Sequence, residues 1–176
     1  DLEGGFAPGL EAAAQLLEVN GRVLPAMLAS NVVLSAETLS GRMMQGESLI
    51  GTSPDPLKRV WLEPEGLPVN PQVVQAIKSA DLIVIGPGSL YTSVIPNFLA
   101  VGMIEALRES RAVKIFVCNV ATQDGETSGY DSSAHFQAFL DHADIAVNHV
   151  IVNSNVEQLP SEWMQTVVKP ERPSGF

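Results

Sequence analysis

The stretch from Ala80 to Asn97, ADLIVIGPGSLYTSVIPN, constrains the fold more than any other part of this chain. Its apolar run Leu82–Ile85 is rich in β-branched residues, which is typical of a strand buried on both faces. The glycines and proline from Gly86 to Gly88 cannot extend a strand, so the chain must turn there. Helical spacing of apolar residues follows from Asn97 to Ser110, and Pro96 suits the first turn of a helix. The stretch therefore predicts a strand, a glycine turn, a hydroxyl-rich loop and a helix.

This loop has the chemistry of an anion-binding loop. Glycines allow close approach to the backbone, turn N–H groups can point at an anion, and hydroxyls can donate to phosphate oxygens. A tyrosine ring can also lie against a base or a sugar. In open α/β sheets, ligands bind at the carboxyl ends of the strands, where this loop lies. The candidate ligand-binding residues are Gly86, Pro87, Gly88, Ser89, Leu90, Tyr91, Thr92 and Ser93, with Asn97, Asn119 and Thr122 as weaker candidates for polar contacts. A plain strand-to-helix connection is the alternative, because Gly-Pro-Gly turns also occur without a ligand.

The rest of the chain predicts an α/β domain with a parallel sheet and flanking helices. Expected helices are Pro8–Val19, one capped by Asn70 that ends near Asp81, and one capped by Asp131 or Ser132 that ends near His142. Expected strands of the parallel sheet are Leu82–Ile85, Val113–Val117 and His149–Val152. Three short segments, Asn31–Leu39, Arg42–Leu49 and Lys58–Leu62, predict a small β-rich insertion over about 22–62. We expect one domain over 1–156 and an extended tail over 157–176, with a short helical turn near Glu162 to Val167.

Composition excludes several classes of partner. Of the 176 residues, only ten are Lys or Arg and the net charge is −10, which argues against nucleic acid as a partner. A small anion remains possible as a ligand, because backbone amides can bind it. Cys118 is the one cysteine, so no intrachain disulfide can form. No apolar stretch reaches the roughly 20 residues that span a membrane, and we expect a cytoplasmic protein.

Familiar catalytic patterns are missing from the sequence. The three histidines are His135, His142 and His149, and their spacing does not match that of zinc ligands on a helix. There is neither a Gly-Lys-Ser/Thr phosphate loop nor a G-x-S-x-G nucleophile motif. Asp124 and Glu126 are the best acid–base candidates in the loop after the second parallel strand. We therefore predict no catalytic residue, no metal site and no required cofactor.

Three segments carry a resemblance to a known family: ADLIVIGPGSLYTSVIPNFL, KIFVCNVATQDGETSGYDSSAHFQAFLDH and the earlier NGRVLPAMLASNVVLSAETLSGRMMQGESLIG. They resemble the gluconeogenesis factor family of the YvcK type, within the group that includes 2-phospho-L-lactate transferase of the CofD type. The resemblance covers most of the chain from Ala7 to Asn153. It implies a Rossmann-like α/β fold.

The resemblance also implies a function. It suggests a regulatory protein that binds a UDP-sugar such as UDP-N-acetylglucosamine, linked to gluconeogenic growth, cell-wall synthesis and cell shape, without established catalysis. The alternative is a magnesium-dependent transferase that moves a phospholactyl group from a guanylylated donor to a deazaflavin precursor. Transferases of that group usually carry a Ser-Asn-Pro-like sequence after the Gly-Pro, whereas this chain has Gly88, Ser89, Leu90 and Tyr91 there.

One departure from the family pattern concerns the start of the chain. Family members begin with a strand and a GGGTG-like turn, followed by a loop rich in aspartate and glycine. Neither of these segments is in this chain, which starts at Asp1. We therefore expect a piece of a longer protein. Because an incomplete sheet has unpaired strand edges, we also expect a homo-oligomer.

Overall fold

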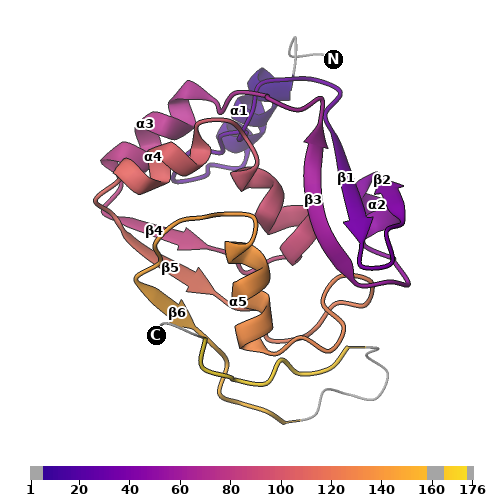
Figure 1. The fold of residues 1–176 in the computed structure, drawn as a ribbon. Coiled ribbons are helices and arrows are strands. Elements are labelled where there is room, and N and C mark those ends of the chain that lie inside the picture. The colour runs from indigo at the N-terminus through magenta and orange to yellow at the C-terminus, as the bar shows by residue number, and fades with distance from the viewer. Residues whose placement is uncertain (1–5, 158–164, 174–176) are drawn as a thin grey trace.

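The computed structural model describes residues 6–157 and 165–173, and its elements form two sheets with helices beside them (Figure 1). In chain order these are α1 (Phe6–Leu16), β1 (Val33–Thr38), β2 (Met43–Gln45), α2 (Glu47–Ile50), β3 (Leu57–Glu63), α3 (Pro71–Ser79), β4 (Leu82–Ile85), the π-helix η1 (Leu90–Val94), the 3₁₀ helix η2 (Ile95–Phe98), α4 (Met103–Glu109), β5 (Val113–Val117), α5 (Ser132–Leu140) and β6 (His149–Ile151). The predicted α/β class, with a parallel sheet and a small β-rich insertion, is confirmed.

The insertion is an antiparallel sheet with the strand order β2-β1-β3. Apolar residues of β1 and β3, such as Leu34 and Leu62, are buried in the core. The predicted strand from Arg42 to Leu49 is wrong in its second half. The chain leaves β2 at Gly46, whose φ of 91° is in the left-handed region, and α2 begins at the next residue.

The parallel sheet has the strand order β4-β5-β6, and Ile85 of β4 lies opposite Phe116 of β5. Local sequence signals start α3, which precedes β4, and α5, which lies between β5 and β6. Asn70 caps α3 by accepting a hydrogen bond from the Gln72 N–H, and Asp131 caps α5 by accepting one from the Ala134 N–H. The predicted cap at Asn70 is confirmed, and of the two alternatives Asp131 and Ser132 it is Asp131 that caps α5.

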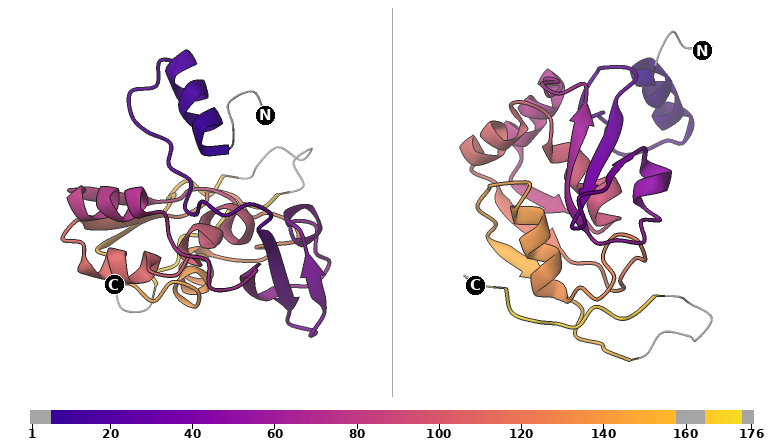
Figure 2. Two further views of the ribbon diagram at one scale, coloured as in Figure 1. Left: turned by 90° about the horizontal axis from the view of Figure 1, so that it is seen from above. Right: turned by 45° about the vertical axis from the view of Figure 1, so that its right-hand side comes forward.

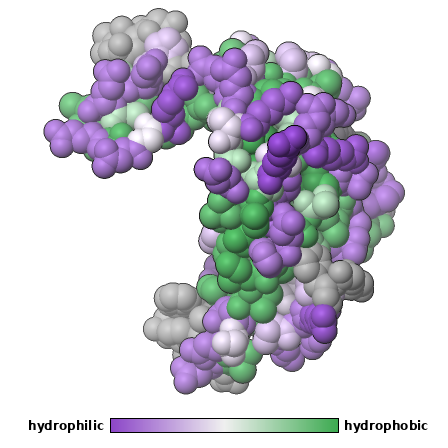
Figure 3. Space-filling view, turned by 90° about the vertical axis from the view of Figure 1, so that its left-hand side faces the viewer, coloured by the Kyte–Doolittle hydropathy of each residue, from purple (hydrophilic) through white to green (hydrophobic). Residues whose placement is uncertain are grey.

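The expectation that β4 is buried on both faces is wrong. Leu82 and Val84 are 52% and 55% exposed, whereas Ile85 is buried. The apolar residues Val113 and Ile151 of β5 and β6 are also exposed. Figure 3 shows a hydrophobic area beside the hollow below the projecting N-terminal part of the molecule. The sequence of β4 predicts a buried strand because all its residues are apolar. In the structure, however, no described residue covers one of its faces.

The predicted continuous helix from Asn97 to Ser110 is also wrong. The chain forms η1 and η2 in succession, and α4 begins only at Met103. Between η2 and α4, the Val101 N–H donates to the Leu67 carbonyl, and the Val101 carbonyl accepts from the Val69 N–H. This pairing holds Val101 in an extended conformation. Gly102 then adopts a left-handed φ of 92°, which ends the continuity of the helix.

An aromatic core joins the parallel sheet to α5. The ring of Phe116 packs on those of Phe136 and Phe139, and Phe98 of η2 packs edge-on against Phe139. His142, just after α5, donates from Nδ1 to the Ala138 carbonyl, and its Nε2 accepts the Val60 N–H of β3 at 3.1 Å. The two sheets are therefore connected through α5.

Helix α1 stands apart from this core (Figure 2). Leu16 on this helix and Leu17 just after it are largely exposed. The chain returns to the body near Asn70, whose backbone N–H donates to the Ala26 carbonyl. At the other end, Val167 pairs with Ala121, and residues 165–173 run along the β5–α5 loop. Residues 162–164 of the helical turn predicted near Glu162 to Val167 lie outside the described residues, and Val167 itself is in an extended bridge.

Candidate functional site

The candidate site is built from the loops that follow β4 and β5, at the carboxyl edge of the parallel sheet (Figure 1). Gly86 opens the first loop with a φ of 76°, and a Cβ there would lie 2.9 Å from the Val117 carbonyl oxygen. Only glycine satisfies both conditions without strain. The first turn therefore packs directly on the end of β5.

Asn119 pairs with the backbone of Gly88 in both directions. Its Oδ1 accepts the Gly88 N–H at 3.1 Å, and its Nδ2 donates to the Gly88 carbonyl at 2.7 Å. One side chain therefore fixes both polar groups of the glycine. Asn119, a weaker candidate for contacts with a ligand, thus lies beside the glycine loop and uses its amide to hold that loop.

Glu126 is the centre of a larger network. Its side chain is buried, with 2% exposure for the residue. Oε1 accepts from the Ser89 hydroxyl at 2.6 Å, the Thr92 hydroxyl at 2.8 Å and the Gln123 amide at 3.2 Å. Oε2 accepts from the Tyr91 N–H at 2.9 Å. The Ser89 and Thr92 hydroxyls also contact each other. The carboxylate thus accepts from three residues of the first loop and from one residue of its own loop.

Tyr91 belongs to the core of the site and not to its surface. It is 2% exposed, and its ring packs edge-on against His142. Its hydroxyl lies 3.1 Å from that of Tyr130. Burial, and then the bond to Tyr130, raise the pKa of the Tyr91 phenol. The ring therefore presents no free face to a base or sugar in this conformation.

The other predicted residues fall into two groups. Pro87, Ser93 and Asn97 are exposed. Leu90 and Thr122 are buried, and the Thr122 hydroxyl pairs with that of Thr166 in the C-terminal segment. The exposed rim of the first loop is therefore the part that is open to a ligand.

Sequence reasoning did not identify Glu126 as the link between the two loops. It singled out Glu126 only as an acid–base candidate, together with Asp124, which is exposed. The partners Ser89 and Thr92 lie 37 and 34 positions away. No local spacing indicates such a contact. The apolar and glycine pattern of the loop also gives no sign of it.

His135 is a buried neighbour of the site whose role the sequence did not indicate. Its Nδ1 donates to the Asp131 carbonyl at 2.9 Å, and its ring packs against Tyr130. Its Nε2 is buried, and no described residue provides it with a hydrogen-bond partner. Burial lowers the pKa of His135, so the neutral form is favoured.

Cys118 lies at the end of β5, beside the site, and it leads to a first prediction. Burial raises the pKa of its thiol from 9.0 to about 11. The native thiol should therefore react slowly with a chromogenic disulfide reagent at about pH 8 and rapidly in guanidinium. Because the unfolded thiol ionises first, stability should fall as the pH rises from 9.0 towards 11. Equal reaction rates in both conditions would contradict this burial.

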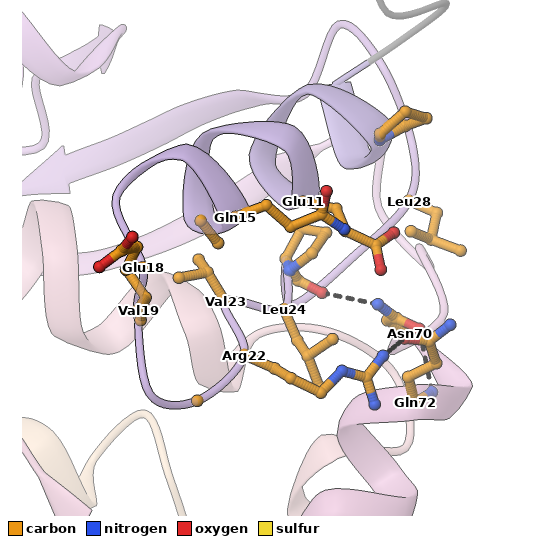
Figure 4. Close-up of a pocket in the computed structure, with 14 residues that line it drawn as sticks. Glu11, Gln15, Glu18, Val19, Arg22, Val23, Leu24, Leu28, Asn70 and Gln72 are labelled. Atoms are coloured by element: carbon orange, nitrogen blue, oxygen red, sulfur yellow. Dashed lines mark hydrogen bonds between the residues drawn. The ribbon is translucent and has the colours of Figure 1, made fainter.

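A separate cavity of about 470 Å³ lies between α1, the chain after it and the start of α3 (Figure 4). Two of its polar side chains make hydrogen bonds within the chain. Arg22 donates to the Gln72 side chain at 2.6 Å, and Asn70 donates to the Pro25 carbonyl at 3.1 Å. None of the predicted ligand-binding residues lines it, so we assign it no role.

Within the described ranges, no group of three or more His, Cys, Asp or Glu side chains is arranged to hold a metal ion. Nor does any helix there combine the length and apolar character that a membrane crossing requires.

The fold and site together define an α/β protein with a glycine loop at the carboxyl edge of a parallel sheet. The profile of the CofD family, described as 2-phospho-L-lactate transferase CofD, matches residues 1–172. The chain belongs to the CofD family, which confirms the resemblance seen in the sequence.

The relatives that this chain matches include gluconeogenesis factors. The chain is similar to the gluconeogenesis factor of Halalkalibacterium halodurans, with 44% identity over 146 residues, 83% of this chain and 45% of the relative. It is similar to the gluconeogenesis factor of Bacillus subtilis, with 41% identity over 163 residues, 92% of this chain and 50% of the relative. A crystal structure of a UPF0052 family member from Bacillus halodurans matches with a TM-score of 0.87 and 39% identity, over 97% of this chain and 57% of that chain. The chain thus spans about half the length of the curated relatives it matches.

Proposed function

We propose that this chain is part of a cytoplasmic regulatory protein that binds a nucleotide-sugar of the UDP-N-acetylglucosamine type. Its role is in gluconeogenic growth, with links to cell-wall synthesis and cell shape. The relatives named gluconeogenesis factor support the regulatory role. The observation that carries the binding proposal is the glycine loop Gly86–Ser93, held in one shape at the carboxyl edge of the parallel sheet.

In this proposal the ligand lies on the exposed rim of the loop. Gly88 offers no free backbone polar group, because Asn119 pairs with both its N–H and its carbonyl; the Cβ it lacks would lie 3.3 Å from Val94 Cγ2, so the glycine allows close packing within the loop. The Ser93 hydroxyl is exposed and supplies a donor there. Asn97 is also exposed, and its amide donates to the Ser93 carbonyl at 2.7 Å. Ser89 and Thr92 are half-buried, and their hydroxyls connect the loop to Glu126.

Calorimetric titration with UDP-N-acetylglucosamine tests the proposal. It is carried out on this chain and on the longer parent protein, with guanosine nucleotides and NAD as controls. We expect saturable binding of the UDP-sugar by the parent. Binding by this chain as well would locate the main contacts in the loops described above. No binding by either protein would overturn the nucleotide-sugar proposal.

The family description favours a second candidate, a phospholactyl transferase. Such an enzyme would need magnesium, and the described residues alone do not offer a cluster of acidic ligands for it. Magnesium-dependent turnover of a guanylylated phospholactate by the parent protein, with a deazaflavin precursor as acceptor, would support this candidate. Absence of turnover together with UDP-sugar binding would reject it.

The uncovered face of the parallel sheet leads to a second prediction, that the chain forms a homo-oligomer. Val84 and its exposed apolar neighbours form a patch of the kind that associates in water. Val84→Glu should shift sedimentation velocity profiles towards the monomer, because a charge cannot be buried there cheaply. Leu49→Glu is the matched control, since Leu49 is similarly exposed, at 61% against 55% for Val84, but lies on α2. Identical profiles for the chain and both variants would contradict association through this face.

A further inference from the structure

Four neutral donors in the site converge on one buried carboxylate. Two hydroxyls, one backbone N–H and one amide surround Glu126, and each of these contacts uses the carboxylate as the acceptor. Such a ring of donors is what a loop offers to a phosphate. Here the chain's own side chain occupies it, so Ser89 and Thr92 do not point at open solvent.

The surroundings of Glu126 decide whether this carboxylate can move aside. The preceding residue, Gly125, packs on the chain after α2, where a Cβ would lie 2.6 Å from the Gly51 carbonyl oxygen and 2.8 Å from the Ser53 nitrogen. The following residue, Thr127, is fully buried, and its hydroxyl accepts the Gln123 N–H at 2.9 Å. Glu126 is therefore held on both sides. This geometry favours a fixed support over a gate that opens for a ligand.

The donors of Ser89, Tyr91, Thr92 and Gln123 that surround the carboxylate are called the donor cradle. We propose that Glu126 is a positioning residue, which fills this cradle and thereby holds the loop Gly86–Ser93 in its binding shape. Its relation to ligand affinity rests on the nucleotide-sugar function proposed above. Its structural role in the cradle does not depend on that function, because the donors and the carboxylate all belong to this chain. A buried carboxylate is costly unless it is fully hydrogen-bonded. Glu126 meets that condition only while the loop keeps this shape.

Glu126→Ala tests the role by chemical rescue. Removal of the side chain leaves the cradle donors without their acceptor, and we expect the thermal midpoint to fall by about 5–10 °C. Sodium formate should restore much of this loss, because a small carboxylate can enter the vacated cradle. Sodium chloride at the same ionic strength should not. Absence of any formate-specific rescue would overturn the proposal, whether or not the protein binds a nucleotide-sugar.

Ligand affinity separates positioning from a merely structural role. In the parent protein, Glu126→Ala should weaken UDP-N-acetylglucosamine binding about tenfold or more, and formate should restore it. The matched control is Glu63→Ala. Glu63 also accepts from three side chains, Ser35, Gln45 and Trp61, but it lies on β3. Its variant should lower the thermal midpoint and leave affinity within about twofold.

The remaining outcomes are also decisive. Tighter binding by Glu126→Ala would show that the carboxylate competes with the ligand for the cradle, which contradicts positioning. Unchanged affinity would contradict it as well. If Glu126→Ala does not fold, Glu126→Gln keeps the volume of the side chain but replaces one acceptor oxygen with a donor. That variant should bind more weakly than the wild type and show no rescue by formate, and wild-type affinity would overturn the proposal. If the wild type itself does not bind the UDP-sugar, the proposed function fails, and the formate rescue alone decides the role of Glu126.

Discussion

Replacing Gly125 with alanine is expected to destabilise the fold by about 3–5 kcal/mol, one of the largest effects open to a single methyl group in this chain. Gly125 has a φ of 84°, and the new Cβ would meet backbone atoms of Gly51 and Ser53 at 2.6 and 2.8 Å. Neither of these atoms can rotate away as a side chain can. The β5–α5 loop or the chain after α2 must shift, and Glu126 would move with the loop.

Gly129→Ala is the matched control for this prediction. Gly129 has a similar φ of 78°, but a Cβ there would meet no atom of the described residues within 4 Å. The substitution should therefore cost only the backbone strain, about 1–2 kcal/mol. Urea denaturation of the two variants measures the difference directly. Equal losses of stability would show that the loop does not pack on the chain after α2 as described.

Local signals explain why much of the fold could be predicted from the sequence. Asn70 before a proline and Asp131 at the start of an apolar pattern each specify a helix start through a contact two or three residues away. Strand-like patterns of apolar residues likewise predict β3 (Leu57–Glu63) and β5 (Val113–Val117). Such patterns depend on neighbours in the chain, so they can be recognised without the tertiary structure.

Features that depend on distant partners could not be predicted. Val101 has the apolar character of a helix face, but its pairing with Leu67 and Val69 overrides that preference. The exposure of Leu82 and Val84 depends on what covers the sheet and not on their own chemistry.

The candidate site shows the same division. The turn at Gly86 could be predicted because glycine tolerates a positive φ, and Gly86 does have a positive φ. The hydroxyls of Ser89 and Thr92 were predicted to face a phosphate, yet here they donate to Glu126. Their side chains have the right chemistry for an anion. The sequence could not show that a carboxylate from the next loop would be the anion they contact.

A second large effect is expected at the exposed rim of the loop. Ser93→Glu places a negative charge where the proposal puts the phosphates of the ligand, and like charges at this range repel strongly. Ser93 is exposed, so the variant should keep the stability of the wild type. We expect the affinity for UDP-N-acetylglucosamine to fall at least about tenfold. Its matched control is Ser79→Glu, the same change at the exposed end of α3, before β4 begins.

Calorimetric titration of the parent protein and these two variants with UDP-N-acetylglucosamine tests the central claim most directly. If the loop Gly86–Ser93 holds the phosphates of a nucleotide-sugar, Ser93→Glu loses affinity, while Ser79→Glu binds like the wild type. If Ser93→Glu binds as tightly as the wild type, the ligand does not lie on this loop and the proposed site is wrong.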